Sequence, residues 1–182
     1  MKYFVISDIH GSSYYLKKVL DEYHKDKYDK LIILGDILYH GPRNDLPEGY
    51  APKECIAMLN HLKDEIEAVR GNCEAEVDQM VLEFPCMETF KTLKINDRKI
   101  YLTHGHVYNI DKLPEDFKEN DVILHGHTHI PTWTEFGKNN LCLNPGSITI
   151  PKNGSKHSYM IIEGNEVKWL GINEGIYHRI SL

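Results

Sequence analysis

Phe4-Val5-Ile6-Ser7-Asp8-Ile9-His10-Gly11 joins a short apolar strand signal directly to two potential metal ligands and a glycine. The same order recurs four times along the chain: an apolar run ends, and Asp, Asn or His follows at once, each time with a glycine beside it. The four recurrences are residues 31–34 before Gly35-Asp36, 66–70 before Gly71-Asn72, 100–103 before His104-Gly105-His106, and 122–125 before Gly126-His127-Thr128-His129. A single Gly-Asp pair is often only a turn, but five such junctions in one chain predict a shared site.

The residue types at these junctions predict a metal centre. In open α/β sheets, ligands bind beyond the carboxyl ends of the strands, where glycine lets the backbone turn sharply. Imidazole and carboxylate groups suit Mn, Fe, Co, Ni or Zn. Seven ligands are too many for one tetrahedral ion and fit two ions that share a carboxylate, the arrangement used for in-line phosphoryl displacement. The candidate metal ligands are Asp8, His10, Asp36, Asn72, His104, His127 and His129.

Length and composition are those of an ordinary globular protein, and we expect one domain spanning residues 1–182. The net charge of −6 argues against binding long nucleic acid, which takes clustered Lys and Arg. It does not exclude phosphate chemistry, because bound cations reverse the sign of the charge locally. No apolar run approaches the roughly 20 residues of a membrane-spanning helix, and the N-terminal apolar run is too short for a signal peptide. We therefore expect a cytoplasmic protein without a membrane partner.

The four cysteines are far apart and form no CxxC pair. This pattern argues against a zinc ribbon and against a disulfide framework. We expect reduced thiols at the positions Cys55, Cys73, Cys86 and Cys142.

The order of apolar patterns predicts an α/β fold. Strands are expected over residues 3–7, 31–34 and 66–69, with helices over 13–26 and 54–62 between them, and this alternation implies parallel pairing. After residue 88 the pattern becomes mostly β: residues 89–95 and 99–103 flank a hairpin turn, and further strands are expected at 122–124, 132–136, 141–143, 159–162 and 167–172. Short helices are expected near 74–84 and 114–119. The chain is thus predicted to contain two packed sheets with helices outside.

At these motifs the sequence resembles the calcineurin-like metallophosphoesterase superfamily. The family pattern runs D-x-H, G-D, G-N-x-[DE], a strand end bearing His, and G-H-x-H, and this chain has all five in that order, the third as Gly71-Asn72-Cys73-Glu74. It is most similar to the small bacterial YfcE-like phosphodiesterases, through residues 35–44, residues 46–52 and Asn144-Pro145-Gly146-Ser147. The resemblance extends from residue 8 to about residue 151.

The resemblance implies a four-layer α/β/β/α sandwich of two mixed sheets. It implies that Asp8, His10 and His129 hold one ion, that Asn72, His104 and His127 hold a second, and that Asp36 bridges both. Manganese is the expected metal, with zinc, iron, nickel and cobalt as alternatives.

One position departs from the pattern of many superfamily members. They place a histidine that protonates the leaving oxygen after Gly-Asn, where this chain has Cys73. A thiol is a poor replacement for imidazole at neutral pH, and the small YfcE-like enzymes share this substitution. Three other side chains are candidates for contacts with substrate: His106 and His40, and Arg43, whose guanidinium can bind two phosphate oxygens or form a loop salt bridge.

These observations predict a metal-dependent phosphodiesterase that hydrolyses a small phosphodiester by a metal-bridging hydroxide. The alternative is a protein-binding scaffold on the same fold, with little or no catalysis. Scaffold members tend to lose ligands, whereas all seven are present here. The expected partner is a small phosphodiester, not a long nucleic acid, and self-association into a homo-oligomer is left open.

Overall fold

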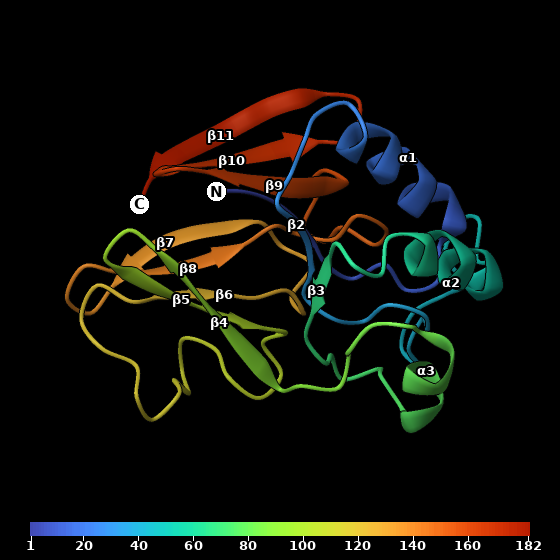
Figure 1. The fold of residues 1–182 in the computed structure, drawn as a ribbon, viewed down its shortest axis with the longest axis horizontal. Coiled ribbons are helices and arrows are strands. Elements are labelled where there is room, and N and C mark those ends of the chain that lie inside the picture. The colour runs from blue at the N-terminus through green and yellow to red at the C-terminus, as the bar shows by residue number, and fades with distance from the viewer.

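The computed structural model describes residues 1–182 and contains two mixed β-sheets and three helices (Figure 1). The first sheet has the strand order β11-β10-β9-β1-β2-β3 and the second has the order β4-β5-β6-β8-β7. The strands of the first sheet are β1 (Lys2–Ile6), β2 (Lys30–Ile33), β3 (Ile66–Ala68), β9 (Ser158–Glu163), β10 (Glu166–Gly171) and β11 (Gly175–Ser181). Those of the second are β4 (Phe90–Ile95), β5 (Arg98–Thr103), β6 (Val122–Leu124), β7 (Thr132–Phe136) and β8 (Asn140–Asn144). The helices are α1 (Ser13–Tyr23), α2 (Pro52–His61) and α3 (Glu76–Val81).

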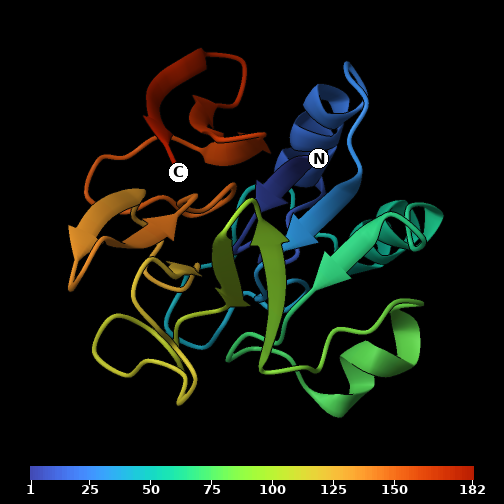
Figure 2. The same cartoon turned by 60° about the vertical axis from the view of Figure 1, so that its left-hand side comes forward.

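The first three strands pair in parallel, as the alternating pattern predicts. β1 pairs with β2, and β2 pairs with β3, so the three run side by side in one direction (Figure 2). The crossover helices start at residues suited to helix N-termini: Ser12 caps α1 by accepting a hydrogen bond from the Tyr15 amide, and Pro52 is the first residue of α2. None of the three helices has the length and apolar composition needed to cross a membrane.

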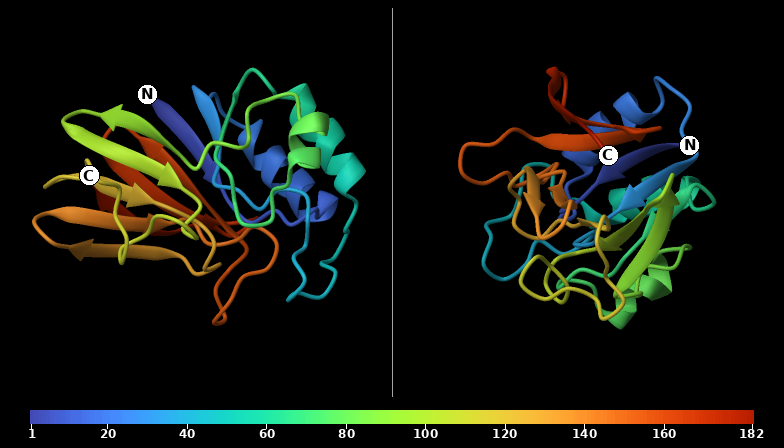
Figure 3. Two further views of the ribbon diagram at one scale, coloured as in Figure 1. Left: turned by 90° about the horizontal axis from the view of Figure 1, so that it is seen from below. Right: turned by 90° about the vertical axis from the view of Figure 1, so that its left-hand side faces the viewer.

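Two apolar cores lie on the two faces of the first sheet. Along β1, Phe4 and Ile6 belong to the core beneath α1 and α2, whereas Tyr3 and Val5 belong to the core between the two sheets. Successive side chains of a strand point to opposite faces, so a strand that is buried on both faces reads as a continuous apolar run. The helices therefore cover one outer face of the molecule, and the second sheet covers the other face of the first (Figure 3).

The outer face of the second sheet is covered by an irregular segment. Phe117 packs there against Tyr101 and Phe136, with ring centroids 5.3 and 6.0 Å apart. The predicted helix over residues 114–119 is wrong, because this segment forms turns. The Asp121 carboxylate accepts a hydrogen bond from the Lys118 amide, and the Asn140 amide donates to the Lys118 carbonyl. These bonds occupy backbone groups that a helix would use.

The C-terminal strand β11 is absent from the sequence prediction. It pairs antiparallel with β10, and the register shifts between Trp169 and Leu170. Its side chains are exposed or half-buried throughout, so it lacks the apolar run that identified the other strands.

Candidate metal centre

The five polar junctions come together where the carboxyl ends of strands from both sheets meet. β1, β2 and β3 lead into the first three junctions, and β5 and β6 lead into the other two. The two sheets are joined at this point, because the His127 amide donates to the Asp8 carboxylate at 3.0 Å. The site is therefore made by two sheets facing each other and not by one open sheet edge.

The backbone at these junctions adopts an unusual conformation. Asp8, His10, Asp36, His127 and His129 all have positive φ, between 48° and 66°. Non-glycine residues seldom adopt this left-handed region, and strained backbone of this kind is concentrated at functional sites. Five of the seven predicted ligands thus hold a conformation that the surrounding packing must impose.

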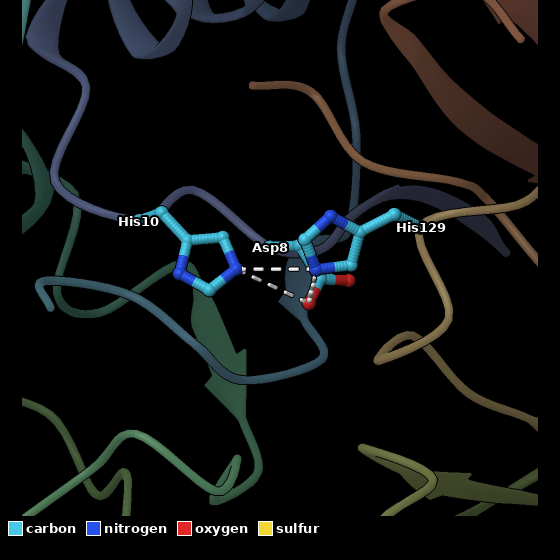
Figure 4. A group of neighbouring side chains, drawn as sticks. All are labelled: Asp8, His10 and His129. Carbon is cyan, nitrogen blue, oxygen red and sulfur yellow. Dashed lines mark hydrogen bonds and ion pairs between the residues drawn. The ribbon is translucent and has the colours of Figure 1, made fainter. Parts of the chain in front are cut away.

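Asp8, His10 and His129 form the first half of the cluster (Figure 4). The Nε2 atoms of His10 and His129 lie 3.2 Å apart and are 3.7 and 3.3 Å from Oδ1 of Asp8. All three side chains are buried. Each histidine donates its Nδ1–H to a backbone carbonyl, His10 to Tyr39 at 2.8 Å and His129 to Ile150 at 2.6 Å. Both Nε2 lone pairs are consequently directed at the carboxylate.

His104, Asn72 and His127 form the second half. Nε2 of His104 lies 3.1 Å from Oδ1 of Asn72 and 3.2 Å from Nδ1 of His127, and its own Nδ1–H donates to the Leu34 carbonyl at 2.6 Å. Asp36 lies between the halves: Oδ1 is 3.4 Å from His104 Nε2, and Oδ2 is 3.7 Å from His10 Nε2. The structure thus brings all seven predicted residues together, with Asp36 in the central position.

The cluster has the donor atoms that divalent ions require. Oδ1 of Asp8 is fully buried and has no hydrogen-bond partner, although buried polar atoms are nearly always paired. In neutral histidines whose Nδ1–H groups are engaged, the facing Nε2 atoms of His10 and His129 are both acceptors. A cation between them and Asp8 would satisfy all three acceptors, and the carbonyls that hold the Nδ1–H groups are the usual partners of metal-ligating histidines. The residues present therefore fit a metal ion.

The pKa values within the cluster reflect its density of charge. Burial opposes ionisation of Asp36, but hydrogen bonding to His104 and the charges of the nearby histidines hold the pKa of this carboxyl well below its usual range. Burial lowers the pKa of His104, yet the hydrogen bond to Asp36 and the charge of Asp8 outweigh it and raise the pKa to about 9. Burial and the charge of His104 lower the pKa of His127 to about 4. A bound cation would take the place of the proton on His104, because metal ligation requires neutral imidazole.

A cavity of about 450 Å³ opens onto the cluster, and most of its lining residues are polar or small. Only one of its twelve lining residues is hydrophobic. No aromatic side chain other than histidine lines it; Tyr14, Tyr39, Tyr108 and Trp133 all lie outside. The lining residues are His10, Asp36, Gly41, Pro42, Arg43, Asn44, Asn72, Cys73, His127, Thr128, His129 and Lys152.

Residues 1–166 match the family model of the calcineurin-like phosphoesterase superfamily domain. The chain belongs to this superfamily. Phosphodiesterase YfcE of Escherichia coli K12 is 41% identical to it over 174 residues, which cover 96% of this chain and 94% of that relative. The probable metallophosphoesterase YsnB of Bacillus subtilis is 29% identical over 59% of this chain and 80% of its own length. The resemblance to YfcE-like phosphodiesterases that the motifs indicated is confirmed.

The solved structure of the phosphoesterase YfcE from E. coli matches this calcineurin-like chain with a TM-score of 0.94 and 39% identity, covering 100% of this chain and 99% of that one. The metallophosphoesterase fold is therefore confirmed. A mutant of Vps29 from Entamoeba histolytica matches with a TM-score of 0.64 and 22% identity over 100% of this chain and 99% of its own. At that identity the likeness shows the fold alone.

The three candidate substrate contacts have different positions in this phosphoesterase. Arg43 lines the cavity and forms no salt bridge, whereas His40 does not line it and packs edge-on between Tyr39 and Tyr50. His106 is exposed, with its ring 5.3 Å from that of His104, but it does not line the cavity either.

Cys73 lines the cavity beside the central carboxylate, and its amide donates to Oδ1 of Asp36 at 2.9 Å. Burial and the charge of Asp36 raise the pKa of its thiol. The thiol therefore stays protonated at neutral pH and is a weak proton donor.

Several residues that support the cluster were missed by sequence reasoning. The buried carboxylate of Glu74 accepts hydrogen bonds from the amides of Asp36, Ile37 and Gly71, which ties two of the junctions together. Burial and the charge of Asp36 raise the pKa of Glu74 to about 7. The G-N-x-[DE] pattern contains this residue, but only the folded chain shows what it binds.

Residues 144–150 support the other side of the cluster. Ser147 donates to the Asp8 carbonyl at 2.9 Å, Thr149 donates to the Ile9 carbonyl at 2.8 Å, and Asn144 donates to the Gly126 carbonyl at 2.7 Å. The Ile150 carbonyl holds His129. The Asn-Pro-Gly-Ser motif was the one signal that could have identified this loop.

Proposed function

We propose that this chain is a phosphodiesterase that uses two divalent ions to hydrolyse a small phosphodiester. Asp8, His10 and His129 would hold one ion, Asn72, His104 and His127 the other, and Asp36 would contribute to both. Manganese is the metal we propose, with zinc, iron, nickel and cobalt as alternatives for the same nitrogen and oxygen ligands. When bound, two dications lower the pKa of water enough to supply hydroxide at neutral pH, and a metal-bridging hydroxide remains the predicted nucleophile.

One observation supports this proposal most strongly. The buried Oδ1 of Asp8 has no hydrogen-bond donor, while Nε2 atoms of two fixed histidines are directed at it. Leaving a buried carboxylate oxygen without a donor is costly, and a cation at this position would satisfy it. The 41% sequence identity to the phosphodiesterase YfcE supports hydrolysis of a phosphodiester as the reaction class.

The side chains of the cavity have distinct tasks in the proposed reaction. Arg43 would bind two phosphoryl oxygens, since a guanidinium matches a phosphate in fork geometry and no carboxylate of the chain engages it. Fixed donors that face the developing negative charge stabilise the transition state. His106 lies beside His104 at the edge of the site, within reach of the leaving group only if that group extends out of the cavity.

The proposed substrate is a small molecule, because the cavity is small and the chain carries a net charge of −6. We also propose that the chain works as one domain over residues 1–182, since both sheets contribute to the site. The proposed location is the cytoplasm. Self-association is not needed to complete it.

The test is a substrate screen of the metal-free protein after reconstitution with Mn²⁺. The panel comprises bis-p-nitrophenyl phosphate, p-nitrophenyl phosphate, cyclic nucleotides and an oligonucleotide. We expect metal-dependent hydrolysis of the aryl diester, lost in His129→Ala and kept in the control His61→Ala, whose side chain is exposed on α2. Turnover that does not depend on metal, or that survives in His129→Ala, would contradict the proposal.

A further inference from the structure

The mouth of the cavity carries two cations that have no partner in the chain. Arg43 lies on the loop after β2, and Lys152 lies on the loop before β9. These two loops project from the same side of the molecule in both views of Figure 3. Neither side chain forms an ion pair, whereas Lys156, four residues beyond Lys152, pairs with Glu174. In a chain with an excess of acidic residues, two free cations at one small cavity indicate an anionic occupant.

The backbone of Lys152 is fixed beside the first half of the cluster. Its amide donates to the His129 carbonyl at 3.2 Å, and its own carbonyl accepts from the Ser155 hydroxyl at 2.7 Å. Its side chain lines the cavity, is exposed, and has no engagement with the rest of the chain. Because the backbone of Lys152 is fixed and its ammonium group is unpaired, this group is positioned to bind an anion that enters the cavity.

A simple phosphodiester does not account for both cations. Its phosphoryl group carries one negative charge, and in the proposed function that charge faces two dications and the guanidinium of Arg43. Lys152 is then not needed to neutralise the scissile phosphoryl group. The rest of the molecule meets no large aliphatic or aromatic hydrocarbon side chain, because eleven of the twelve lining residues are not hydrophobic. The lining therefore favours a substrate in which the part beyond the phosphoryl group is polar or charged.

We propose that Lys152 is a specificity-determining residue that binds a second anionic group, a carboxylate or a phosphate, carried by the phosphodiester. This inference rests on the proposed phosphodiesterase function and names the class of substrate. Arg43 serves the scissile phosphoryl group, which all substrates share, and Lys152 serves the group that distinguishes them. The ammonium forms a charge-assisted hydrogen bond, about twice as strong as a neutral one.

The test compares two diesters with the same leaving group, p-nitrophenyl propyl phosphate and p-nitrophenyl 3-carboxypropyl phosphate, on the Mn²⁺-loaded enzyme. We expect kcat/KM to be about tenfold higher for the carboxylate diester, the size of one charge-assisted hydrogen bond. Lys152→Met should bring the ratio to about one, and Lys152→Glu should reverse it. Arg43→Met should lower both rates and leave the ratio intact. Lys156→Met, on the same loop but outside the cavity, is the matched control and should change neither rate.

A second readout does not depend on turnover. Calorimetric titration with propyl methylphosphonate and 3-carboxypropyl methylphosphonate should show the same preference in wild type and its loss in Lys152→Met. Equal binding of both ligands by wild type, or an equal loss of both in Lys152→Met, would overturn the inference. If neither diester were hydrolysed but the phosphonate preference remained, the phosphodiesterase proposal would fail and the anion site would stand.

Discussion

The two halves of the metal centre differ in how firmly the fold holds them. Asp8, His10 and His129 are 0%, 2% and 3% exposed, and both histidines are fixed through Nδ1 by backbone carbonyls. In the other half only His104 is buried and fixed in this way, whereas Asn72 is exposed and His127 is half-buried without a carbonyl partner. A buried and pre-oriented set of ligands loses less freedom on binding. The first half should therefore bind its ion more tightly, and the second should be the side where substrate and solvent enter.

The supports of the halves also differ. Residues 144–150 hold the first half through the carbonyls of Asp8 and Ile9 and through His129. The Glu74 carboxylate accepts hydrogen bonds from the backbone amides of Asp36 and of Gly71, which leads into Asn72. A Cβ on Gly71 would lie 2.2 Å from Oδ1 of Asp36, so the two junctions approach as closely as glycine allows. Loss of either support should therefore weaken the two halves unequally.

The largest effect expected from this difference concerns the leaving group. Cys73 lines the cavity at the position where a histidine would serve as acid. General acid catalysis typically contributes about 10²–10⁴-fold. Wild type should favour aryl over alkyl diesters by a margin of that order, and diesters over monoesters. In a series of diesters assayed with Mn²⁺, the rate should depend steeply on the pKa of the leaving group in wild type. The dependence should be flatter in Cys73→His.

The same series in His106→Ala is the control for another acid. A flat wild-type dependence that steepens in His106→Ala would show that His106 already supplies the proton. A dependence that is flat in wild type and unchanged by both substitutions would refute this account of position 73.

Replacing the central carboxylate should have the next largest effect. Asp36→Asn removes charge from both halves at once, whereas His129→Ala affects one. Changes outside the ligand set typically cost about 10–100-fold, so we expect diesterase activity to fall by more than 100-fold. Activity of Asp36→Asn within tenfold of wild type would rule out a shared role.

Glu74→Gln should weaken the open half more than the first half. The amide can accept with only one oxygen, so at least one of the three backbone amides loses its partner. We expect the weaker Mn²⁺ affinity to fall by about 10–100-fold, measured by calorimetric titration of the metal-free protein. The tighter affinity should fall less, although Asp36 also faces His10. Equal loss at both steps would mean that Glu74 supports the whole centre.

Ser147→Ala should weaken the first half more than the open half. Its effect on metal affinity should be smaller than that of Glu74→Gln. The Ser147 hydroxyl donates to the Asp8 carbonyl and accepts from the amides of Thr149 and Ile150, all of them buried or nearly so. We expect the tighter Mn²⁺ affinity to fall by about tenfold and the free energy of unfolding to fall by about 1–3 kcal/mol. The double variant with Glu74→Gln should show additive losses, because the supports share no partner. A strong interaction between the two substitutions would indicate that the supports are coupled.

The order of motifs allowed the fold class and all seven clustered residues to be predicted, because each junction is local: an apolar strand ends and a ligand follows. What the sequence could not show depends on distant contacts. Ser147 and Asp8 are 139 residues apart, and Lys152 enters the cavity only because its loop folds back onto His129. The sequence pattern of residues 114–119 predicted a helix. In the folded chain the side chains of Asp121 and Asn140 bind the backbone groups of Lys118 that a helix would use. Strand β11 was missed because it lacks an apolar face.

We propose that two ions occupy the two unequal halves and that Asp36 joins them. Anomalous diffraction from crystals grown with Mn²⁺ tests it most directly. The account predicts two manganese peaks roughly 3.5–4 Å apart, one contacting Asp8, His10 and His129 and the other contacting Asn72, His104 and His127, with Asp36 contacting both. At limiting Mn²⁺ the first peak should be the stronger. A single peak at saturating Mn²⁺, or two peaks that do not share Asp36, would contradict the account.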